Sequence, residues 1–283
     1  MKKLKHYYLR LLSYISKKHM FNYAYNCHRG KLPNYKNPQD LSEFILSQSL
    51  QGNINKLYKY ADKYAVRNYI IAKGYENILV KLLGVYESVE EVKLNDLPSK
   101  YVIKLNNGCG LNIVNYGIDL KLEEVKVKLI NWFKKTNYKY EEHYNLIEPK
   151  ILIEEFVIDL NPKLKIPRDY KFMCYNGKVK CILVCDERDP NTGKANLYAF
   201  DKQWNVLNDY LNPRTINNNL EKPKSLDEMI KISENLASDF KFVRVDLYDS
   251  INGIKFSELT FTPAMGIMAY FTNEALIEMF SIE

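Results

Sequence analysis

Short runs of alternating hydrophobic and polar residues fill much of the chain from residue 101 onward, and longer stretches between them have the spacing of a helix. Period-two alternation is typical of a half-buried strand, and apolar residues three and four apart are typical of an amphipathic helix. Strands are predicted at 101–105, 151–158, 169–175, 178–185, 242–249 and 254–261. Helices are predicted at 121–135 and 225–238. This mixture predicts an α+β fold.

The first 73 residues are predicted to be mainly helical. Residues 2–18 place Leu4, Leu11 and Ile15 on one helical face, opposite a face rich in lysine. Such a helix either packs on the domain with its lysines in water or lies on a membrane surface. Glycine and prolines in 28–41 indicate a connector, after which helical patterning resumes at 40–50 and 61–73.

The strongest candidate site is the predicted hairpin at 242–262, whose turn is indicated by Asn252-Gly253. Period two can bring charged and hydroxyl side chains to one face, and these are Arg244, Asp246, Glu258, Thr260 and Thr262. A two-residue loop at Asn252-Gly253 would separate Asp246 from Glu258, whereas a three-residue loop at 251–253 would set them directly opposite each other. We therefore predict a loop with an odd number of residues, three being favoured.

Two carboxylates that face each other repel unless a cation lies between them. Carboxylate and hydroxyl oxygens together suit Mg²⁺. The alternative is a salt-bridge cluster around Arg244 that holds no metal. Both interpretations of this face remain open.

A second candidate is the segment 101–114, in which Lys104 lies inside an apolar strand and is followed by Gly108, Cys109 and Gly110. Glycines let backbone N–H groups approach a phosphate, so the strand, the lysine and the loop are consistent with a phosphate site. Neither common phosphate motif is present. The GxxxxGK[ST] loop is absent, and Ile113 stands where GxGxxG requires its third glycine. An ordinary glycine turn with a solvated lysine is the alternative.

Two more segments carry charge within predicted strands. Glu154 and Glu155 interrupt 151–158, which is either a strand end that faces an adenine or an edge strand with a solvated glutamate. Asp169 and Lys171 share a strand face, so they either address a ribose and an anionic group or form a surface ion pair.

The composition narrows the class of protein. The chain has 283 residues, 46% of them hydrophobic, and a formal net charge of +7, which suits an anionic partner. Five scattered cysteines fit free thiols in a reducing compartment, so a cytoplasmic protein is expected. The apolar runs are too short for a membrane span.

Seven motifs, taken in order, resemble the ATP-grasp superfamily and its teichuronopeptide-biosynthesis, or TupA-like, branch of bacterial surface-polysaccharide enzymes. They are Asn37-Pro-Gln-Asp-Leu, Asp62-Lys-Tyr-Ala-Val-Arg67, the segment 97–110, Ile153-Glu-Glu-Phe-Val157, Asp169-Tyr-Lys-Phe172, Val243-Arg-Val-Asp-Leu-Tyr248 and the segment 258–266. The resemblance implies an ATP-grasp fold in which two α+β subdomains clasp ATP. Residues 1–60 are expected to form a helical segment, 61–150 the first subdomain and 151–283 the second.

The resemblance also implies roles for matching residues. Phosphates of ATP would be held by Lys63, Lys104, Gly108, Cys109 and Gly110. Adenine and ribose would be held by Glu154, Glu155, Phe156, Val157 and Asp169. Mg²⁺ would be held by Asp246, Glu258 and Thr260, where Thr260 replaces an asparagine common in such ligases, and Arg244 and Lys171 would be catalytic.

The implied activity is ATP-dependent ligation of an amino acid to a uronic-acid-bearing glycan through an acyl phosphate. An acidic glycan also fits the net charge of +7. No nucleic-acid partner is expected, and peripheral contact with the cytoplasmic face of the membrane is an option for the N-terminal helix. Two other classes remain open, namely a glycosyltransferase of capsule or surface-polysaccharide synthesis and a non-catalytic nucleotide- or glycan-binding module.

Overall fold

The computed structural model describes residues 16–108, 110–135, 138, 140–189, 192–213 and 220–281. The helices are α2 (Lys17–Arg29), α3 (Leu41–Leu50), α4 (Tyr58–Ala61), α5 (Val66–Ala72), α6 (Leu122–Lys135), α7 (Leu226–Ala237) and α8 (Asn273–Phe280). Short 3₁₀ helices are η1 (Ile54–Leu57), η2 (Glu76–Ile78), η3 (Glu142–Leu146) and η4 (Pro263–Gly266).

The strands form two sheets, each antiparallel between all the neighbours in the described part of the chain. One sheet has the order β1-β4-β2-β3, from Leu82–Tyr86, Ile151–Glu155, Lys100–Leu105 and Asn112–Tyr116. The other has the order β7-β6-β5-β8-β9, from Asn196–Phe200, Lys178–Asp186, Asp169–Tyr175, Phe242–Ser250 and Gly253–Thr260. The predicted α+β class is confirmed.

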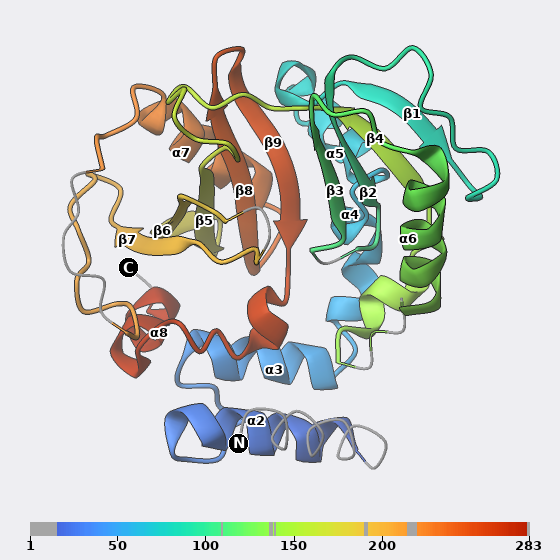
Figure 1. Cartoon of the computed structure of the whole chain (residues 1–283). Coiled ribbons are helices and arrows are strands. Elements are labelled where there is room, and N and C mark those ends of the chain that lie inside the picture. The colour runs from blue at the N-terminus through green and yellow to red at the C-terminus, as the bar shows by residue number, and fades with distance from the viewer. Residues whose placement is uncertain are drawn as a thin grey trace.

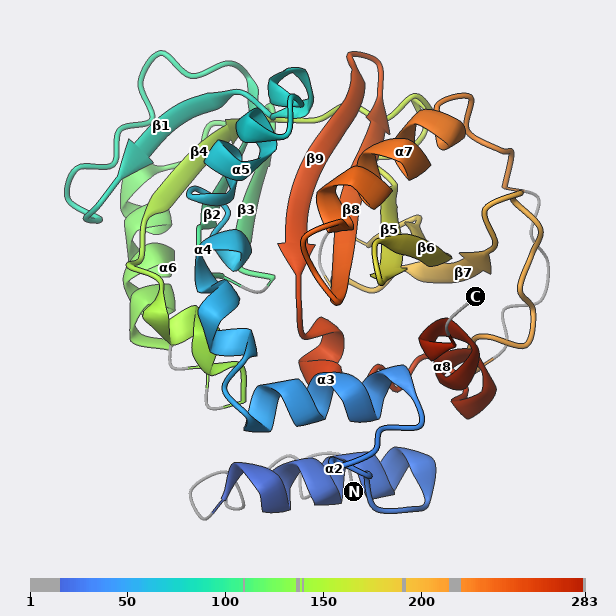
Figure 2. The ribbon, with the colours of Figure 1, turned by 180° about the vertical axis from the view of Figure 1, so that it is seen from behind.

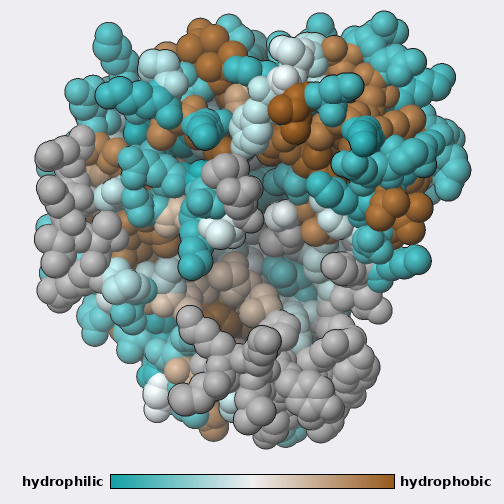
Figure 3. Space-filling view, in the orientation of Figure 1, coloured by the Kyte–Doolittle hydropathy of each residue, from teal (hydrophilic) through white to brown (hydrophobic). Residues whose placement is uncertain are grey.

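The two sheets lie side by side, with β9 nearest the four-stranded sheet and with α3 and α2 below both (Figures 1 and 2). A parallel bridge between Leu79 and Phe256 joins the two halves at this edge. Figure 3, in the orientation of Figure 1, shows that the surface is hollowed between the two sheets. The chain leaves the four-stranded sheet after Glu155, so the boundary predicted between residues 150 and 151 lies one strand earlier than this crossing.

Alternation along the strands decides which face each helix covers. In β8, Val243, Val245 and Leu247 pack with the apolar side of α7, in the core of the five-stranded sheet. The opposite face is covered at one end by α3 and α8, and there Met173 and Tyr175 of β5 are buried. The other part of that face carries polar and charged side chains. In the four-stranded sheet, α6 covers the face formed by apolar residues of β2 and β4.

The β5–β6 hairpin turns at Asn176-Gly177, between the strands predicted at 169–175 and 178–185. Both residues have positive φ, 50° and 72°, as a two-residue hairpin turn with Asn-Gly requires. Tyr175 pairs directly with Lys178 across it.

The β8–β9 hairpin shows that the predicted loop length is wrong. Ser250 pairs with Gly253, so the loop contains two residues, Ile251 and Asn252. A β-bulge follows, because Leu247 pairs with Phe256 whereas Asp246 pairs with Glu258, which leaves Ser257 as the extra residue. The predicted pairing of Asp246 with Glu258 is therefore confirmed, but the bulge produces it rather than a three-residue loop.

Other differences concern element ends. The helix predicted at 61–73 is α5, which begins later, at Val66, because Ala61 is the last residue of α4 and a turn follows it. The strand predicted at 151–158 ends at Glu155. Most of the helix predicted at 2–18 lies outside the described residues. Within the described residues no helix is both long and apolar enough to cross a membrane.

Candidate active site

The centre of the candidate site is an arginine between two opposed carboxylates on β8 and β9. Arg244 donates from Nε to Asp246 Oδ1 at 2.6 Å and from Nη2 to Asp246 Oδ2 at 2.7 Å. The same Nη2 donates to Glu258 Oε1 and to Thr260 Oγ1, each at 3.0 Å. The bulge at Ser257 allows this arrangement, because Phe256 and Leu259 can both enter the core while Glu258 stays on the polar face.

Lys171 adds a second cation from the neighbouring strand β5. Its Nζ lies 2.5 Å from Asp246 Oδ2 and 3.5 Å from Asp169 Oδ2. Asp169 also accepts a hydrogen bond from Arg188 Nη2 at 2.7 Å. Asp246, whose side chain is almost fully buried, is thus held by two cations.

Lys63 connects the two halves of the molecule. It lies in the turn between α4 and α5, and its backbone N–H donates to Asn106 O. Its Nζ lies 2.8 Å from the carbonyl oxygen of Gly108 and 3.1 Å from Glu258 Oε2. The glycine loop of one sheet and the carboxylate of the other therefore share one ammonium group.

A separate ion pair lies on the four-stranded sheet. Lys104 Nζ lies 2.6 Å from Glu154 Oε2, on the sheet face opposite α6. Glu155 is exposed, and Phe156 and Val157 begin the connection to the five-stranded sheet. Gly110 has a φ of 69°, in the left-handed region that glycine favours, and Cys109 lies outside the described residues.

Burial and charge act against each other on the central groups. Burial raises the pKa of Glu258, but Lys63, Arg244 and Lys171 outweigh it and hold that pKa well below its usual range. Burial lowers the pKa of Lys171, but Asp169 and Asp246 outweigh it and raise that pKa above its usual value. Glu258 and Lys171 are therefore both charged at neutral pH.

The structure thus brings seven of the fifteen predicted site residues into one cluster. One cluster on the five-stranded sheet contains Arg244, Asp246, Glu258, Thr260, Lys171 and Asp169, with Lys63 reaching it from the other half. The pair of Lys104 and Glu154 stands apart, and the structure describes no ion pair between it and this cluster.

The residue-level predictions did not include two groups at the cluster. Arg188, which lies two residues beyond the end of β6, contacts Asp169 and was given no role in the sequence prediction. Glu141 accepts a hydrogen bond from Thr262 Oγ1 at 2.6 Å, across a separation of 121 residues. Thr262 belongs to the motif at 258–266, so its part of this contact could be predicted. No sequence pattern around Glu141 indicates a role for that residue.

His143, which follows Glu141 on η3, provides a test of pH-dependent stability. It is buried, its Nε2 has no hydrogen-bond partner among the described residues, and burial and Lys17 lower its pKa from 6.5 to about 4. Between these values the unfolded chain binds the proton that the folded chain does not, so stability falls as pH falls. We expect about 2 kcal/mol of unfolding free energy to be lost between pH 7.5 and 5 through this residue.

Denaturant melts at several pH values check this expectation. His143→Phe should flatten the acid decline, and His19→Phe, at an exposed histidine of α2, should leave it unchanged. An identical pH dependence in wild type and His143→Phe would contradict a neutral buried imidazole.

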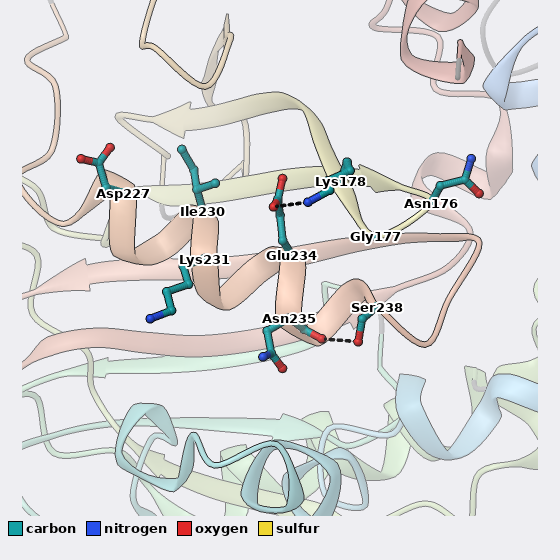
Figure 4. A pocket seen from close by; sticks show the side chains of 9 residues that line it. All are labelled: Asn176, Gly177, Lys178, Asp227, Ile230, Lys231, Glu234, Asn235 and Ser238. Atoms are coloured by element: carbon teal, nitrogen blue, oxygen red, sulfur yellow. Dashed lines mark hydrogen bonds and ion pairs between the residues drawn. The ribbon is translucent and has the colours of Figure 1, made fainter. Parts of the chain in front are cut away.

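A groove outside the cluster lies where α7 meets the β5–β6 turn (Figure 4). It is lined by Asn176, Gly177, Lys178, Asp227, Ile230, Lys231, Glu234, Asn235 and Ser238. Lys178 pairs with Glu234 at 3.2 Å within it. Because α7 covers the sheet face opposite Arg244 and Asp246, the groove is separate from the charged cluster.

Comparison with solved structures shows distant similarity. D-alanine–D-alanine ligase from Bacillus anthracis has a TM-score of 0.42 and 16% identity, over 80% of this chain and 59% of that chain. L-amino acid ligase from Bacillus licheniformis has a TM-score of 0.47 and 11% identity, over 80% and 50%. D-cycloserine synthetase DcsG has a TM-score of 0.48 and 10% identity, over 84% and 76%. The chain thus spans 59% and 50% of the length of the first two.

No curated protein sequence matches the chain. A family model described as TupA-like ATPgrasp, however, matches residues 43–280. This match covers most of the chain and includes every residue of the charged cluster. It confirms the resemblance found in the sequence motifs and, with the two α+β halves described above, the predicted ATP-grasp fold. The chain therefore belongs to the TupA-like ATP-grasp family.

Proposed function

We propose that the protein is an ATP-dependent carboxylate–amine ligase that joins an amino acid to a uronic-acid-bearing surface glycan. The observation that carries this proposal is the directly opposed pair of Asp246 and Glu258, neutralised by Lys63, Lys171 and Arg244. Phosphoryl transfer requires cations and a metal site around one point, and catalysis there consists mostly of positioning and charge stabilisation.

In this proposal ATP lies between the two sheets. Lys63, Lys104 and the backbone of 106–110 bind phosphates, and the proximity of Lys63 to Gly108 supports this set. Adenine lies against the backbone of four consecutive residues, Glu154, Glu155, Phe156 and Val157. The ribose is bound by Asp169. The support is the position of 154–157, where the chain crosses from one sheet to the other.

Asp246, Glu258 and Thr260 fit Mg²⁺ by their chemistry, since two carboxylates and a hydroxyl are oxygen donors. Their placement supports this assignment, because the carboxylates face each other across β8 and β9, and Thr260 Oγ1 lies 3.0 Å from Glu258 Oε1. When bound, Mg²⁺ would neutralise charge on the phosphates. Lys63 and Lys171 can exchange a carboxylate partner for a phosphate, because both have flexible side chains.

The reaction has two steps. A carboxylate oxygen of the acceptor attacks the γ-phosphorus, the bond to the β,γ-bridging oxygen breaks and ADP leaves. The amine then attacks the acyl carbon, a C–N bond forms and phosphate leaves. Arg244 is proposed to stabilise the charge on the transferred phosphoryl group and on the tetrahedral species that follows, and Lys171 to hold the acceptor carboxylate or a phosphate oxygen.

Two observations support an acidic glycan as the acceptor. The chain belongs to the TupA-like family. The resemblance of its sequence motifs to that family implies a hexuronic-acid polymer as the acceptor. Its net charge of +7 attracts a polyanion over the roughly 8 Å Debye length of physiological salt. The proposed place of action is the cytoplasm, where ATP is available.

An ADP-release screen tests the proposal. Amino acids are combined with oligomeric uronic acids in the presence of ATP and Mg²⁺, and products are identified by mass spectrometry. ADP release that requires both an amine and a carboxylate, with an amide product, supports the ligase. Consumption of a nucleotide-sugar instead of ATP would indicate a glycosyltransferase, and ATP binding without turnover in every combination would indicate a binding module.

Lys104→Met is expected to raise the KM for ATP about tenfold or more. A charge-assisted hydrogen bond to a phosphate contributes roughly 1.5–3 kcal/mol, and each 1.4 kcal/mol is a factor of about ten in affinity. Lys100→Met is the matched control, because Lys100 starts the same strand but is exposed. A KM for ATP that is equal in both variants would remove Lys104 from the phosphate site.

A further inference from the structure

A carboxylate without an assigned role lies at one end of the charged cluster. Leu259 and Phe261 point into the core, so Glu258, Thr260 and Thr262 share the opposite face. Thr262 Oγ1 donates to Glu141 Oε1 at 2.6 Å. Glu141 therefore continues the row of polar groups that begins at Glu258.

The position of Glu141 along this row is informative. Thr262 follows Thr260, the last residue of β9, by two positions, and the charges of Arg244 and Glu258 both act on the Glu141 carboxyl. Thr260 itself contacts Arg244 Nη2 at 3.0 Å. Glu141 thus lies one step beyond the arginine proposed to act on the reacting phosphoryl group.

The opposite end of the row lies near the crossing segment. Asp159 bridges to Ser250, and the backbone N–H of Ile251 donates to Ile158 O. The proposed adenine site at 154–157 is therefore near the hairpin turn, and Glu141 is beyond the central cluster. A nucleotide laid along this row with its phosphates at the cluster would direct the γ-phosphate toward Glu141.

The surroundings of Glu141 suit a group that exchanges a proton. Its side chain is partly exposed, so a substrate can reach it. Burial raises its pKa, although the hydrogen bond from Thr262 and the charge of Arg244 oppose this, and the charge of Glu258 reinforces it. Thr262, which is buried, fixes the direction of one carboxylate oxygen.

We propose that Glu141 is a catalytic residue that binds the ammonium group of the amine substrate beside the acyl phosphate and accepts one of its protons. This inference rests on the proposed ligase function. It assigns the amine substrate to the space between Arg244 and Glu141, at the end of the cluster away from the hairpin turn.

The step balances as follows in atoms and charge. The carboxylate of Glu141 takes one proton from the ammonium group, which leaves a neutral amine. The nitrogen lone pair forms the C–N bond, and the C–O bond to phosphate breaks. The second nitrogen proton leaves with the phosphate as HPO₄²⁻, and Glu141 releases its proton to solvent.

Hydroxylamine separates this role from the formation of the acyl phosphate. It is neutral at physiological pH and attacks acyl phosphates without a base, giving a hydroxamate that can be measured by its colour with ferric ion. The experiment compares wild type with Glu141→Gln in hydroxamate formation from ATP, Mg²⁺ and uronic acid, and in amide formation with the amino acid found in the screen.

We expect Glu141→Gln to lower amide formation about 10²-fold or more and to leave hydroxamate formation at the wild-type rate. Glu142→Gln is the matched control, because Glu142 is the next residue and pairs with Lys17 at 3.0 Å. It should leave both products unchanged.

Each other result overturns the inference. Equal loss of both products would mean that Glu141 only supports the fold of the site, and no loss of either would mean that it has no role. Failure of the proposed function is distinguishable, because wild type itself would then form no hydroxamate with any uronic acid.

Discussion

Glu258→Gln and Asp246→Asn are each expected to lower ATP-dependent turnover about 10³-fold while the protein stays folded. Each substitution removes one of two opposed anionic ligands but keeps the size of the side chain. Lys63, Arg244 and Lys171 hold Glu258 in its charged form. The neutral glutamine therefore no longer balances the charge of these three cations. Turnover is measured as ADP release at saturating ATP over a range of Mg²⁺ concentrations, and folding by circular dichroism.

Surface carboxylates that also pair with lysine are the controls. Glu234→Gln neutralises a carboxylate of α7 that pairs with Lys178. Asp239→Asn neutralises a carboxylate that pairs with Lys73. Both should retain full turnover, since among the described residues neither carboxylate contacts the charged cluster and Glu234 stands on α7, which covers the opposite face of the sheet. Wild-type Mg²⁺-dependent activity in the double variant of Asp246 and Glu258 would refute the metal assignment.

The β8–β9 hairpin shows how much of the site could be predicted. Period two correctly placed Arg244, Asp246 and Glu258 on one face, but the loop length derived from it was wrong. The sequence does carry a signal for the bulge. Apolar residues stand at 254 and 256 and then at 259 and 261, so the period breaks by one residue at the bulge.

The break between α4 and α5 has a local signal in Asp62, whose Oδ1 accepts a hydrogen bond from the backbone N–H of Tyr64. Helical spacing continues through 61–73, but the backbone N–H of Lys63 donates to Asn106 O and its side chain reaches Gly108. Contacts with a distant loop outweigh the local helical preference there. Strand β1 was not predicted either. Its residues, Leu82–Tyr86, are all half-buried, so they show no alternation between a buried and an exposed face.

Residues close together in sequence were therefore the predictable part of the site. Arg244 and Asp246 lie on one strand, and Asp169 and Lys171 on another, so alternation alone relates them. Lys63 was identified through the family resemblance. Glu141 was not identified, because it comes from a loop whose position depends on packing of the whole chain.

Arg244→Met is expected to lower turnover about 10³-fold and, at the same time, to lower the Mg²⁺ concentration needed for half-maximal activity. The guanidinium contacts Asp246 and Glu258 within 3.0 Å, so its charge competes directly with a cation at the same oxygens. Unit charges at about 4 Å interact by roughly 4 kcal/mol near a protein surface, which is enough to change metal affinity strongly. Calorimetric titration with Mg²⁺ and single-turnover ADP release measure the two effects separately.

Arg244→Lys separates the charge of this side chain from its planar fork. Lysine keeps the positive charge but cannot donate in parallel to both oxygens of Asp246 while reaching Glu258 and Thr260. We therefore expect Mg²⁺ affinity near that of wild type but turnover well below it. Full turnover in Arg244→Lys would show that charge alone suffices, and unchanged Mg²⁺ affinity in Arg244→Met would show that the arginine and the metal do not compete. In the methionine variant Asp246 retains Lys171 and Glu258 retains Lys63, so loss of turnover there would not result from leaving a buried carboxylate without a cation.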